Sequence, residues 1–487
     1  MGTDDHDLEL PIKLGPCSNG EYDPVPLGPV EREAIRRTRE EADDHARRLG
    51  VDRRTFLRSV SGAALMLMTL SACHSESRKA KGKAPGGHYR LPSASTTEPD
   101  AARSAIGGEE LVFDVQSHFL EYDPTHQSGG GFAVAFPQAR CGEADPKSCF
   151  SIEHYLEEIF LKSDTSMAVI SAVPIPGAAS PLSVDQMERA RRAFAAVCGD
   201  GRLLLHGGAF PQLGPLPAAL DGMASLAAQH RIAAWKVYTH LPGTWWLDDH
   251  EAGVPRVGNA FLDQARALGI KTVCVHKGFG VLFGAGNADY ASPIDVGPAA
   301  KAHPDLRFVV YHSGFEPGSP EGPYTEETAN VGVNRLVKTV VDHGVGPGGN
   351  VYAELGSTWW NVMRNPTQAA HVLGKLLVHV GPDNLLWGTD SIWYGSPQDQ
   401  IQAFRAFELA PELQERFGYP ALTPDVKRKI LGENAARLYG VKPVTQKCTF
   451  TRAELEQVRQ ALPTPNRTYG PRTARAVREL LATHGIA

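Results

Sequence analysis

Two features of the sequence predict an α/β fold, a (β/α)8 TIM barrel over residues 109–441. Short apolar runs alternate with longer amphipathic stretches eight times in this region, as in parallel strands connected by helices. Polar residues follow several of the runs, and such barrels build their sites at the carboxyl ends of the strands. A doubly wound sheet also alternates strands and helices, but eight units with polar residues clustered after the strands favour the barrel.

The expected strands are rich in Val, Leu, Ile and Phe, as is typical of strands buried on both faces. They are residues 111–118, 166–174, 203–211, 233–240, 271–278, 307–314, 351–357 and 384–391. Segments such as 184–198 and 259–269 lie between them and have the apolar spacing of helices. A last helix with Thr423 as N-cap, Pro424 at its first position and Gly440 as its stop would close the barrel.

Residues 1–73 are expected to be an export signal outside the fold. Arg53 and Arg54 precede an apolar stretch of residues 60–70 and small residues before Cys73. This order is typical of a twin-arginine signal with a lipoprotein-type cleavage site. It predicts export to the periplasm or cell surface, with a lipid on Cys73 that anchors the protein to a membrane. A short buried helix after a chance pair of arginines is the alternative.

The segments on either side of the barrel are expected to carry no chemistry. Residues 74–108 are rich in Ser, Lys, Ala, Gly and Pro and poor in large apolar residues, which predicts a flexible linker. Residues 442–487 predict a short C-terminal helical extension on the outside of the barrel, with one or two polar helices at 452–461 and 471–484. Cys141 and Cys149 enclose a short polar loop, and they either form a disulfide outside the cytoplasm or remain two thiols.

Charge and hydropathy exclude two classes of protein. The formal net charge is −6 and the pI is about 6.3, whereas a nucleic-acid-binding protein would carry a basic face. No apolar run reaches the roughly 20 residues that span a bilayer. The catalytic part is therefore expected to be soluble and to act on a small-molecule substrate.

Four of the expected strands end in residues that can bind a metal. His276, His312 and Asp390 end the fifth, sixth and eighth strands, and each is followed within two residues by Gly or Ser. The first strand ends in the sequence DVQSH at 114–118. Because residues two apart on a strand face the same side, positions 114, 116 and 118 are expected to face the barrel interior together. Imidazole and carboxylate groups brought to one rim indicate a metalloenzyme.

These segments together resemble the amidohydrolase-related family, in the branch that includes aminocarboxymuconate-semialdehyde decarboxylase. The matching pieces are DVQSH, His276, His312, the GTDS segment with Asp390, and KILGENAARLYGV in the closing helix. The resemblance covers residues 111 to about 441. The family usually carries His-x-His on its first strand, and this chain has Gln116 in place of the first histidine.

The resemblance implies one divalent metal ion, Zn²⁺ or alternatively Mn²⁺, held by His118, His276 and Asp390. Gln116 would then be a weaker fourth ligand, because a neutral amide adds no charge, or a hydrogen-bond partner of bound water. Asp390 would transfer protons, and His312 would polarise the substrate or water. Related barrels are often dimers, so a homodimer is the expected oligomer.

Aromatic residues are concentrated just beyond the strand ends, where pocket walls are built. They predict a large pocket for a small cyclic or aromatic substrate, in which Arg364 would bind a substrate anion. The expected pocket residues are Tyr238, His240, Trp245, Trp246, Trp359, Trp360, Arg364 and Trp393.

The sequence therefore predicts an exported, metal-dependent hydrolase that activates water at its metal. Two alternatives remain. A non-oxidative decarboxylase of an aromatic or muconate-like acid could use the same ligands. A barrel whose metal site is impaired by Gln116 could act as a binding protein.

Overall fold

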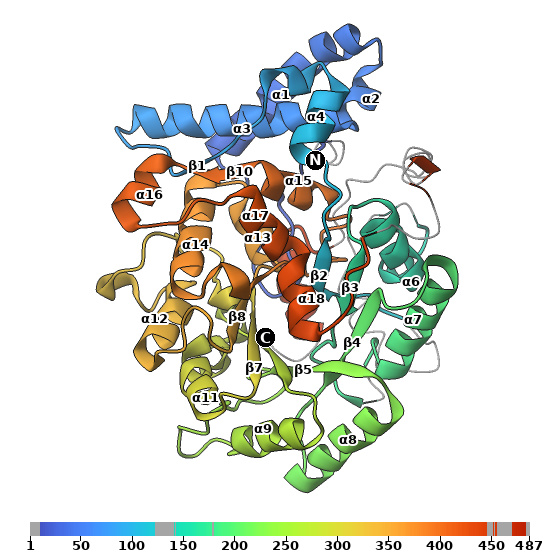
Figure 1. The fold of residues 1–487 in the computed structure, drawn as a ribbon, viewed down its shortest axis with the longest axis vertical. Coiled ribbons are helices and arrows are strands. Elements are labelled where there is room, and N and C mark those ends of the chain that lie inside the picture. The colour runs from blue at the N-terminus through green and yellow to red at the C-terminus, as the bar shows by residue number, and fades with distance from the viewer. Residues whose placement is uncertain are drawn as a thin grey trace.

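The molecule is centred on eight parallel strands that follow one another in chain order (Figure 1). They are β2 (Phe113–Ser117), β3 (Met167–Ile170), β4 (Leu203–Gly208), β5 (Ile232–Tyr238), β6 (Thr272–His276), β7 (Arg307–Tyr311), β8 (Val351–Glu354) and β9 (Leu385–Leu386). Ser117 forms a parallel bridge with Ser391, and the Val115 amide donates to the Trp387 carbonyl at 3.0 Å. These contacts join the first strand to the last, so the predicted TIM barrel is confirmed. The computed structural model describes residues 10–121, 141, 143–177, 180–445, 451, 453–454 and 470–483.

Helices cover the outside of the barrel and connect its strands. They include α7 (Val184–Cys198), α8 (Leu216–Gln229), α9 (Gly258–Ala267), α11 (Val296–Ala302), α12 (Asn334–His343), α14 (Pro366–His379) and α15 (Gln398–Ala406). The chain then forms α17 (Pro424–Arg428), a π-helical turn and α18 (Asn434–Tyr439). The Thr423 hydroxyl accepts from the Val426 amide at 3.3 Å, and Gly440 ends the helix in the left-handed region. The predicted closing helix therefore begins and ends where its capping residues indicated.

The prediction that side-chain directions alternate strictly along the first strand is wrong at the end of that strand. The register between β2 and β3 is irregular between Asp114 and Ser117. Val115 packs in a buried cluster with Val309 and Leu386, whereas the Asp114 carboxylate accepts from the backbone amides of Gln116 and Thr389, each at 3.0 Å. Asp114 thus holds the ends of β2 and β9 together and does not face the same space as Gln116.

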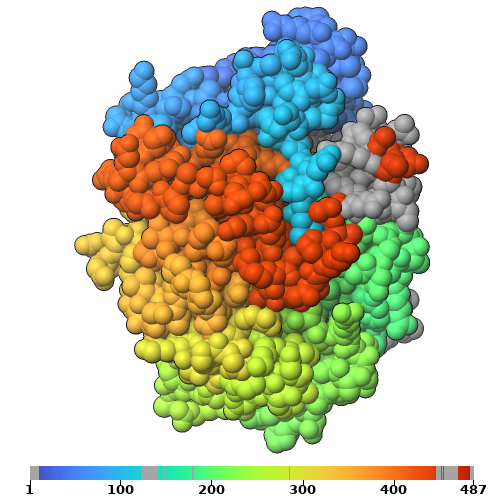
Figure 2. All heavy atoms as spheres, in the orientation of Figure 1, coloured from blue at the N-terminus to red at the C-terminus, as the bar shows by residue number. Residues whose placement is uncertain are grey.

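The region expected to be an export signal folds as a helical layer beside the barrel. It contains α1 (Pro29–Leu49), α2 (Arg53–Leu57) and α3 (Val60–Ala80). The apolar stretch of the expected signal forms the first half of α3 and buries residues such as Met66 and Leu67. Figure 2 shows this layer, in blue, resting on the orange segment of the C-terminal third. None of the helices among the described residues is long and apolar enough to cross a membrane.

Residues 74–108, expected to be a flexible linker, contain regular elements. Strand β1 (Gly87–Tyr89) pairs antiparallel with β10 (Phe407–Leu409), and α4 (Pro99–Ile106) follows a 3-10 turn. Tyr89 and Ile106 are buried. A few apolar side chains suffice to fold this segment, because neighbouring elements already supply the surface against which they pack. The composition of the segment alone does not reveal this.

Of the two states considered for Cys141 and Cys149, the structure has the disulfide. Within the described chain, Cys73 and Cys274 are buried free thiols, and Cys17 is also buried. In the C-terminal extension, the helix expected near 471–484 is present as α20 (Ala474–Thr483). The helix expected at 452–461 lies outside the described residues except for positions 453 and 454.

Candidate active site

The predicted strand-end residues meet at the carboxyl end of the barrel. His276 is the last residue of β6, His312 follows β7 directly, and Asp390 lies four residues beyond β9. His118 and Gln116 reach the same place from the end of β2. All five side chains are buried.

Several of these residues have a backbone conformation that non-glycine residues rarely adopt. The φ angles are 64° at His312, 54° at Ser313, 53° at Ser357 and 57° at Asp390. The buried Glu354 carboxylate accepts from the His312 amide at 3.0 Å and so supports the first of these turns. Strained turns of this kind are held where the surrounding structure fixes them, and they cluster at functional sites.

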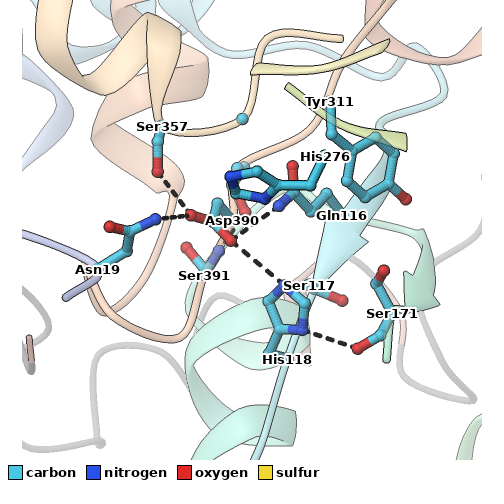
Figure 3. A network of polar contacts seen from close by, with 12 residues as sticks. Asn19, Gln116, Ser117, His118, Ser171, His276, Tyr311, Ser357, Asp390 and Ser391 are labelled. Atoms are coloured by element: carbon cyan, nitrogen blue, oxygen red, sulfur yellow. Dashed lines mark hydrogen bonds and ion pairs between the residues drawn. The ribbon is translucent and has the colours of Figure 1, made fainter. Parts of the chain in front are cut away.

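Asp390 lies at the centre of the hydrogen-bond network drawn in Figure 3. Its Oδ1 accepts from Gln116 Nε2 at 2.9 Å and lies 3.2 Å from His118 Nε2. Its Oδ2 accepts from Ser357 Oγ at 2.6 Å and from Asn19 Nδ2 at 2.8 Å. Burial alone would raise the pKa of Asp390, but the contacts with its neighbours, chiefly His118, outweigh burial and lower it. The carboxylate is therefore charged at neutral pH.

His118 Nε2 lies beside the Asp390 carboxylate, whereas His312 Nε2 lies 3.3 Å from Gln116 Nε2. His118 Nδ1 contacts the Ser171 carbonyl and His312 Nδ1 the Gly356 carbonyl, both at 2.7 Å. A carbonyl only accepts, so Nδ1 carries a proton in both rings, and the neutral His312 ring keeps a lone pair on Nε2. Burial lowers the pKa of His312 to about 4 and that of His276 well below its usual value. Histidines that bind metal commonly donate their second N–H to a carbonyl in this way.

The structure brings a carboxylate from the N-terminal segment to the same place. The ligand atoms of Glu21, His276 and His312 all lie within 4.8 Å of one another. Glu21 Oε1 is 3.6 Å from His276 Nε2, which is buried and has no hydrogen-bond partner in the described chain. Burial, followed by the nearby charge of Asp390, raises the pKa of Glu21. The Asp390 and Glu21 carboxylates, the unpartnered His276 Nε2 and the His312 ring converge here, and this donor set fits a divalent metal ion.

A pocket opens above these residues. Its floor is polar and contains Gln116, His118, His276, His312 and Asp390. Its walls are mostly apolar and come from the strand-end loops and from both ends of the chain. They include Val173, Pro174, Tyr238, Leu241, Phe283, Trp393, Leu480 and Leu481.

A family model described as amidohydrolase matches residues 183–441, which is more than half of the chain. The chain belongs to the amidohydrolase family. The match begins after β2, so it includes His276, His312 and Asp390 but not Gln116 or His118.

Solved structures of several amidohydrolase-like enzymes are similar to 68% of this chain. The 2,6-dihydroxybenzoate decarboxylase from Rhizobium is 14% identical over 99% of its own length, with a TM-score of 0.40. The 4-oxalomesaconate hydratase from Rhodopseudomonas palustris is 13% identical over 96%, with a TM-score of 0.43. The dihydroorotase from Campylobacter jejuni is 15% identical over 84%, with a TM-score of 0.36. No curated protein matches the chain.

In this amidohydrolase, only some of the aromatic residues predicted for the pocket line it. Tyr238 and Trp393 do, and the Trp393 ring stacks on His118 with a centroid distance of 6.1 Å. Trp245 packs edge-on against Phe261, and Trp246 stacks on Tyr290.

The remaining predicted pocket residues lie behind the site. Trp359 packs in the core against Phe404, and Trp360 stacks on Tyr394. The His240 ring lies 4.8 Å from that of His276, and burial lowers its pKa to about 3. Arg364 donates to the carbonyls of Leu14 and Val25, so it binds the N-terminal segment rather than a substrate anion.

Sequence reasoning missed the contribution of both chain ends to the amidohydrolase site. Asn19 and Glu21 reach the site from a segment read as part of an export signal, and Leu480 comes from the extension expected to lie outside. One local signal was available: residues 10, 12 and 14 are apolar and alternate with other positions, as in a segment with one buried side.

Proposed function

We propose that the chain is a metal-dependent hydrolase that acts on a small cyclic or aromatic substrate. The observation that carries this proposal is the meeting of three buried imidazoles, the buried Asp390 carboxylate and the half-buried Glu21 carboxylate beneath a mostly apolar pocket. Among these groups, His276 Nε2 is buried without a hydrogen-bond partner in the described residues, which indicates a ligand at this place.

The donor set suits Zn²⁺ or Mn²⁺, because neutral imidazole and carboxylate are the usual ligands of these ions. Such an ion would be held by His118, His276 and Asp390, with His312 and Glu21 beside them. When bound, it would polarise a carbonyl group and lower the pKa of water toward neutrality.

Asp390 is the group best placed to move a proton. It is charged at neutral pH, and hydrogen bonds from Asn19, Gln116 and Ser357 fix its orientation. It can take a proton from attacking water and later deliver it to the leaving group. His312 has its only proton on Nδ1, bonded to a carbonyl. Its Nε2 therefore accepts rather than donates, and this favours a role as ligand or proton acceptor over the polarising role expected from the sequence.

The pocket walls favour a flat, largely apolar substrate. The Trp393 and Tyr238 rings and the Phe283 side chain surround the space above the polar floor. The Tyr238 hydroxyl donates to the Ala172 carbonyl at 3.0 Å, so its proton is already engaged within the protein. Aromatic faces without free polar groups bind planar rings by stacking and exclude water from the reacting bond.

Decarboxylation of an aromatic acid is the second candidate, since the same polar floor could bind a substrate carboxylate. Asp390 could then relay a proton from water to carbon as the carbon–carboxylate bond breaks and CO₂ leaves. The purified full-length protein, loaded with Zn²⁺ or Mn²⁺, is incubated with lactones, cyclic amides and aromatic acids. Hydrolysis releases an acid or amine, whereas decarboxylation releases CO₂. Turnover that disappears in Asp390→Asn supports an enzyme of the stated kind. Binding of ring compounds without turnover under any metal condition would instead indicate a binding protein.

A further inference from the structure

The N-terminal segment from Leu10 to Tyr22, here called the strap, is held firmly against the barrel mouth. The Leu10, Ile12 and Leu14 side chains are buried. Lys13 and Asp399 form a buried ion pair at 2.9 Å, in which both side chains are 3% exposed or less. Two charges removed from water persist only when they are closely paired, so this contact fixes the position of the strap.

The far end of the strap is fixed by independent contacts. The Ser18 amide donates to the Pro471 carbonyl at 2.9 Å, which ties the strap to the chain just before α20. The Tyr22 hydroxyl donates to the Cys17 carbonyl at 3.0 Å and lies 3.0 Å from the Tyr394 hydroxyl. Glu21 lies between these anchor points.

Asn19 orients Glu21 within the site. Its side-chain NH₂ group donates to Glu21 Oε2 at 2.7 Å and to Asp390 Oδ2 at 2.8 Å. The Glu21 amide in turn donates to Asn19 Oδ1 at 3.0 Å. One carboxylate oxygen of Glu21 is thus engaged, and the other, Oε1, faces His276.

The separation of Glu21 Oε1 from His276 Nε2 fits two ligands of one ion. At 3.6 Å the two atoms are too far apart for a hydrogen bond. Ligands at the Zn–N and Zn–O distances seen in proteins are roughly 3.4 Å apart when the ion is tetrahedral. His276 Nε2 is buried and has no other partner in the described chain, and His312 Nε2 or Nδ1 completes a group within 4.8 Å.

We propose that Glu21 is a metal ligand which the strap delivers from outside the barrel. It supplies the anionic ligand near Gln116, whose neutral amide adds no charge and whose Nε2 donates to Asp390. This inference rests on the proposed metal-dependent function. The metal site is complete only while the strap is docked, so the N-terminal segment is part of the active site.

Processing of the chain would alter this metal site. Cleavage before Cys73, as a lipoprotein-type signal would require, removes the strap and with it Glu21. Export with cleavage and a complete metal site therefore exclude each other. The mass of the protein purified from its own host distinguishes a full-length chain from one that begins at Cys73.

The test is Zn²⁺ affinity, measured by competition with a chromophoric chelator on metal-free, full-length protein. Glu21→Gln keeps the size of the side chain and its contact with Asn19 but removes the charge. We expect its Zn²⁺ dissociation constant to rise about 10-fold or more. Glu21→Asp keeps the charge on a shorter side chain and should fall between wild type and Glu21→Gln.

Asp23→Asn is the matched control, because Asp23 directly follows the strap but pairs with Arg478 at 2.7 Å. It should bind Zn²⁺ like the wild type, and far-ultraviolet circular dichroism confirms that each variant is folded. Equal Zn²⁺ affinity in wild type and Glu21→Gln overturns this inference alone. A wild-type chain that takes up no Zn²⁺ overturns the metal-dependent function as well. A chain beginning at Cys73 with full-length affinity also contradicts the role of Glu21.

Discussion

Replacing Lys236 with methionine should make the protein more stable at neutral pH. Lys236 lies on β5, and its side chain is completely buried. Its Nζ has no hydrogen-bond partner in the part of the chain described by the structure, and it lies 3.7 Å from the centre of the Tyr311 ring. Contact with the aromatic ring only partly replaces the lost hydration of an ammonium ion. Methionine fills a similar volume without a charge.

The expected gain follows from the pKa of Lys236, which burial lowers from 10.5 to about 8. This difference corresponds to about 3 kcal/mol of destabilisation of the folded state. Below pH 8 the ammonium is charged in both the folded and unfolded chain, so the full penalty applies. As the pH rises from 8 toward 10.5, the folded protein loses the proton first and the penalty disappears. Lys236→Met should therefore raise the free energy of unfolding by about 3 kcal/mol at pH 7 and by little at pH 10.5.

Urea denaturation followed by tryptophan fluorescence measures this difference. Wild type and Lys236→Met are compared at pH 7 and pH 10.5 in a chelating buffer, so that bound metal does not contribute. A wild type at least as stable as the variant at pH 7 would refute the reasoning. So would an equal difference at both pH values, because the gain would then not arise from the charge.

Three further outcomes are expected. Ser357→Ala removes the 2.6 Å hydrogen bond to Asp390 and should lower the free energy of unfolding by about 2 kcal/mol in the same assay; an unchanged value would mean that water replaces the hydroxyl. His276→Ala should reduce Zn²⁺ content, measured by elemental analysis of protein dialysed against trace Zn²⁺, to well below one ion per chain; full occupancy would exclude His276 as a ligand. Joint replacement of Cys141 and Cys149 by serine opens a disulfide loop with a sequence separation of 8, and should cost about 2.5 kcal/mol of stability. An unchanged free energy of unfolding in the double variant would contradict this expectation.

The residues at the strand ends could be predicted because their placement is a local property. A run of buried residues defines a strand, and the next residue then lies at the rim whatever the rest of the chain does. His276, His312 and Asp390 meet for this reason, and the family resemblance pointed to the same residues. The aromatic residues beyond the strands were harder to place. Trp359 and Trp393 follow strands in similar ways, yet one packs in the core and the other lines the pocket, and loop packing alone separates them.

The sequence by itself determined the barrel, its closing helix and the polar residues at its rim, because these depend on periodicity and capping over a few residues. Only the tertiary structure showed that Asn19 bonds to Asp390, 371 positions away, and that Leu480 lines the same pocket. Contacts between such distant segments leave no periodic pattern in the sequence. Each segment, taken alone, resembles ordinary polar or apolar surface. Glu21 is the clearest example. It lies in a short polar segment of the region expected to be a signal, and this segment reaches the site only when the barrel has folded.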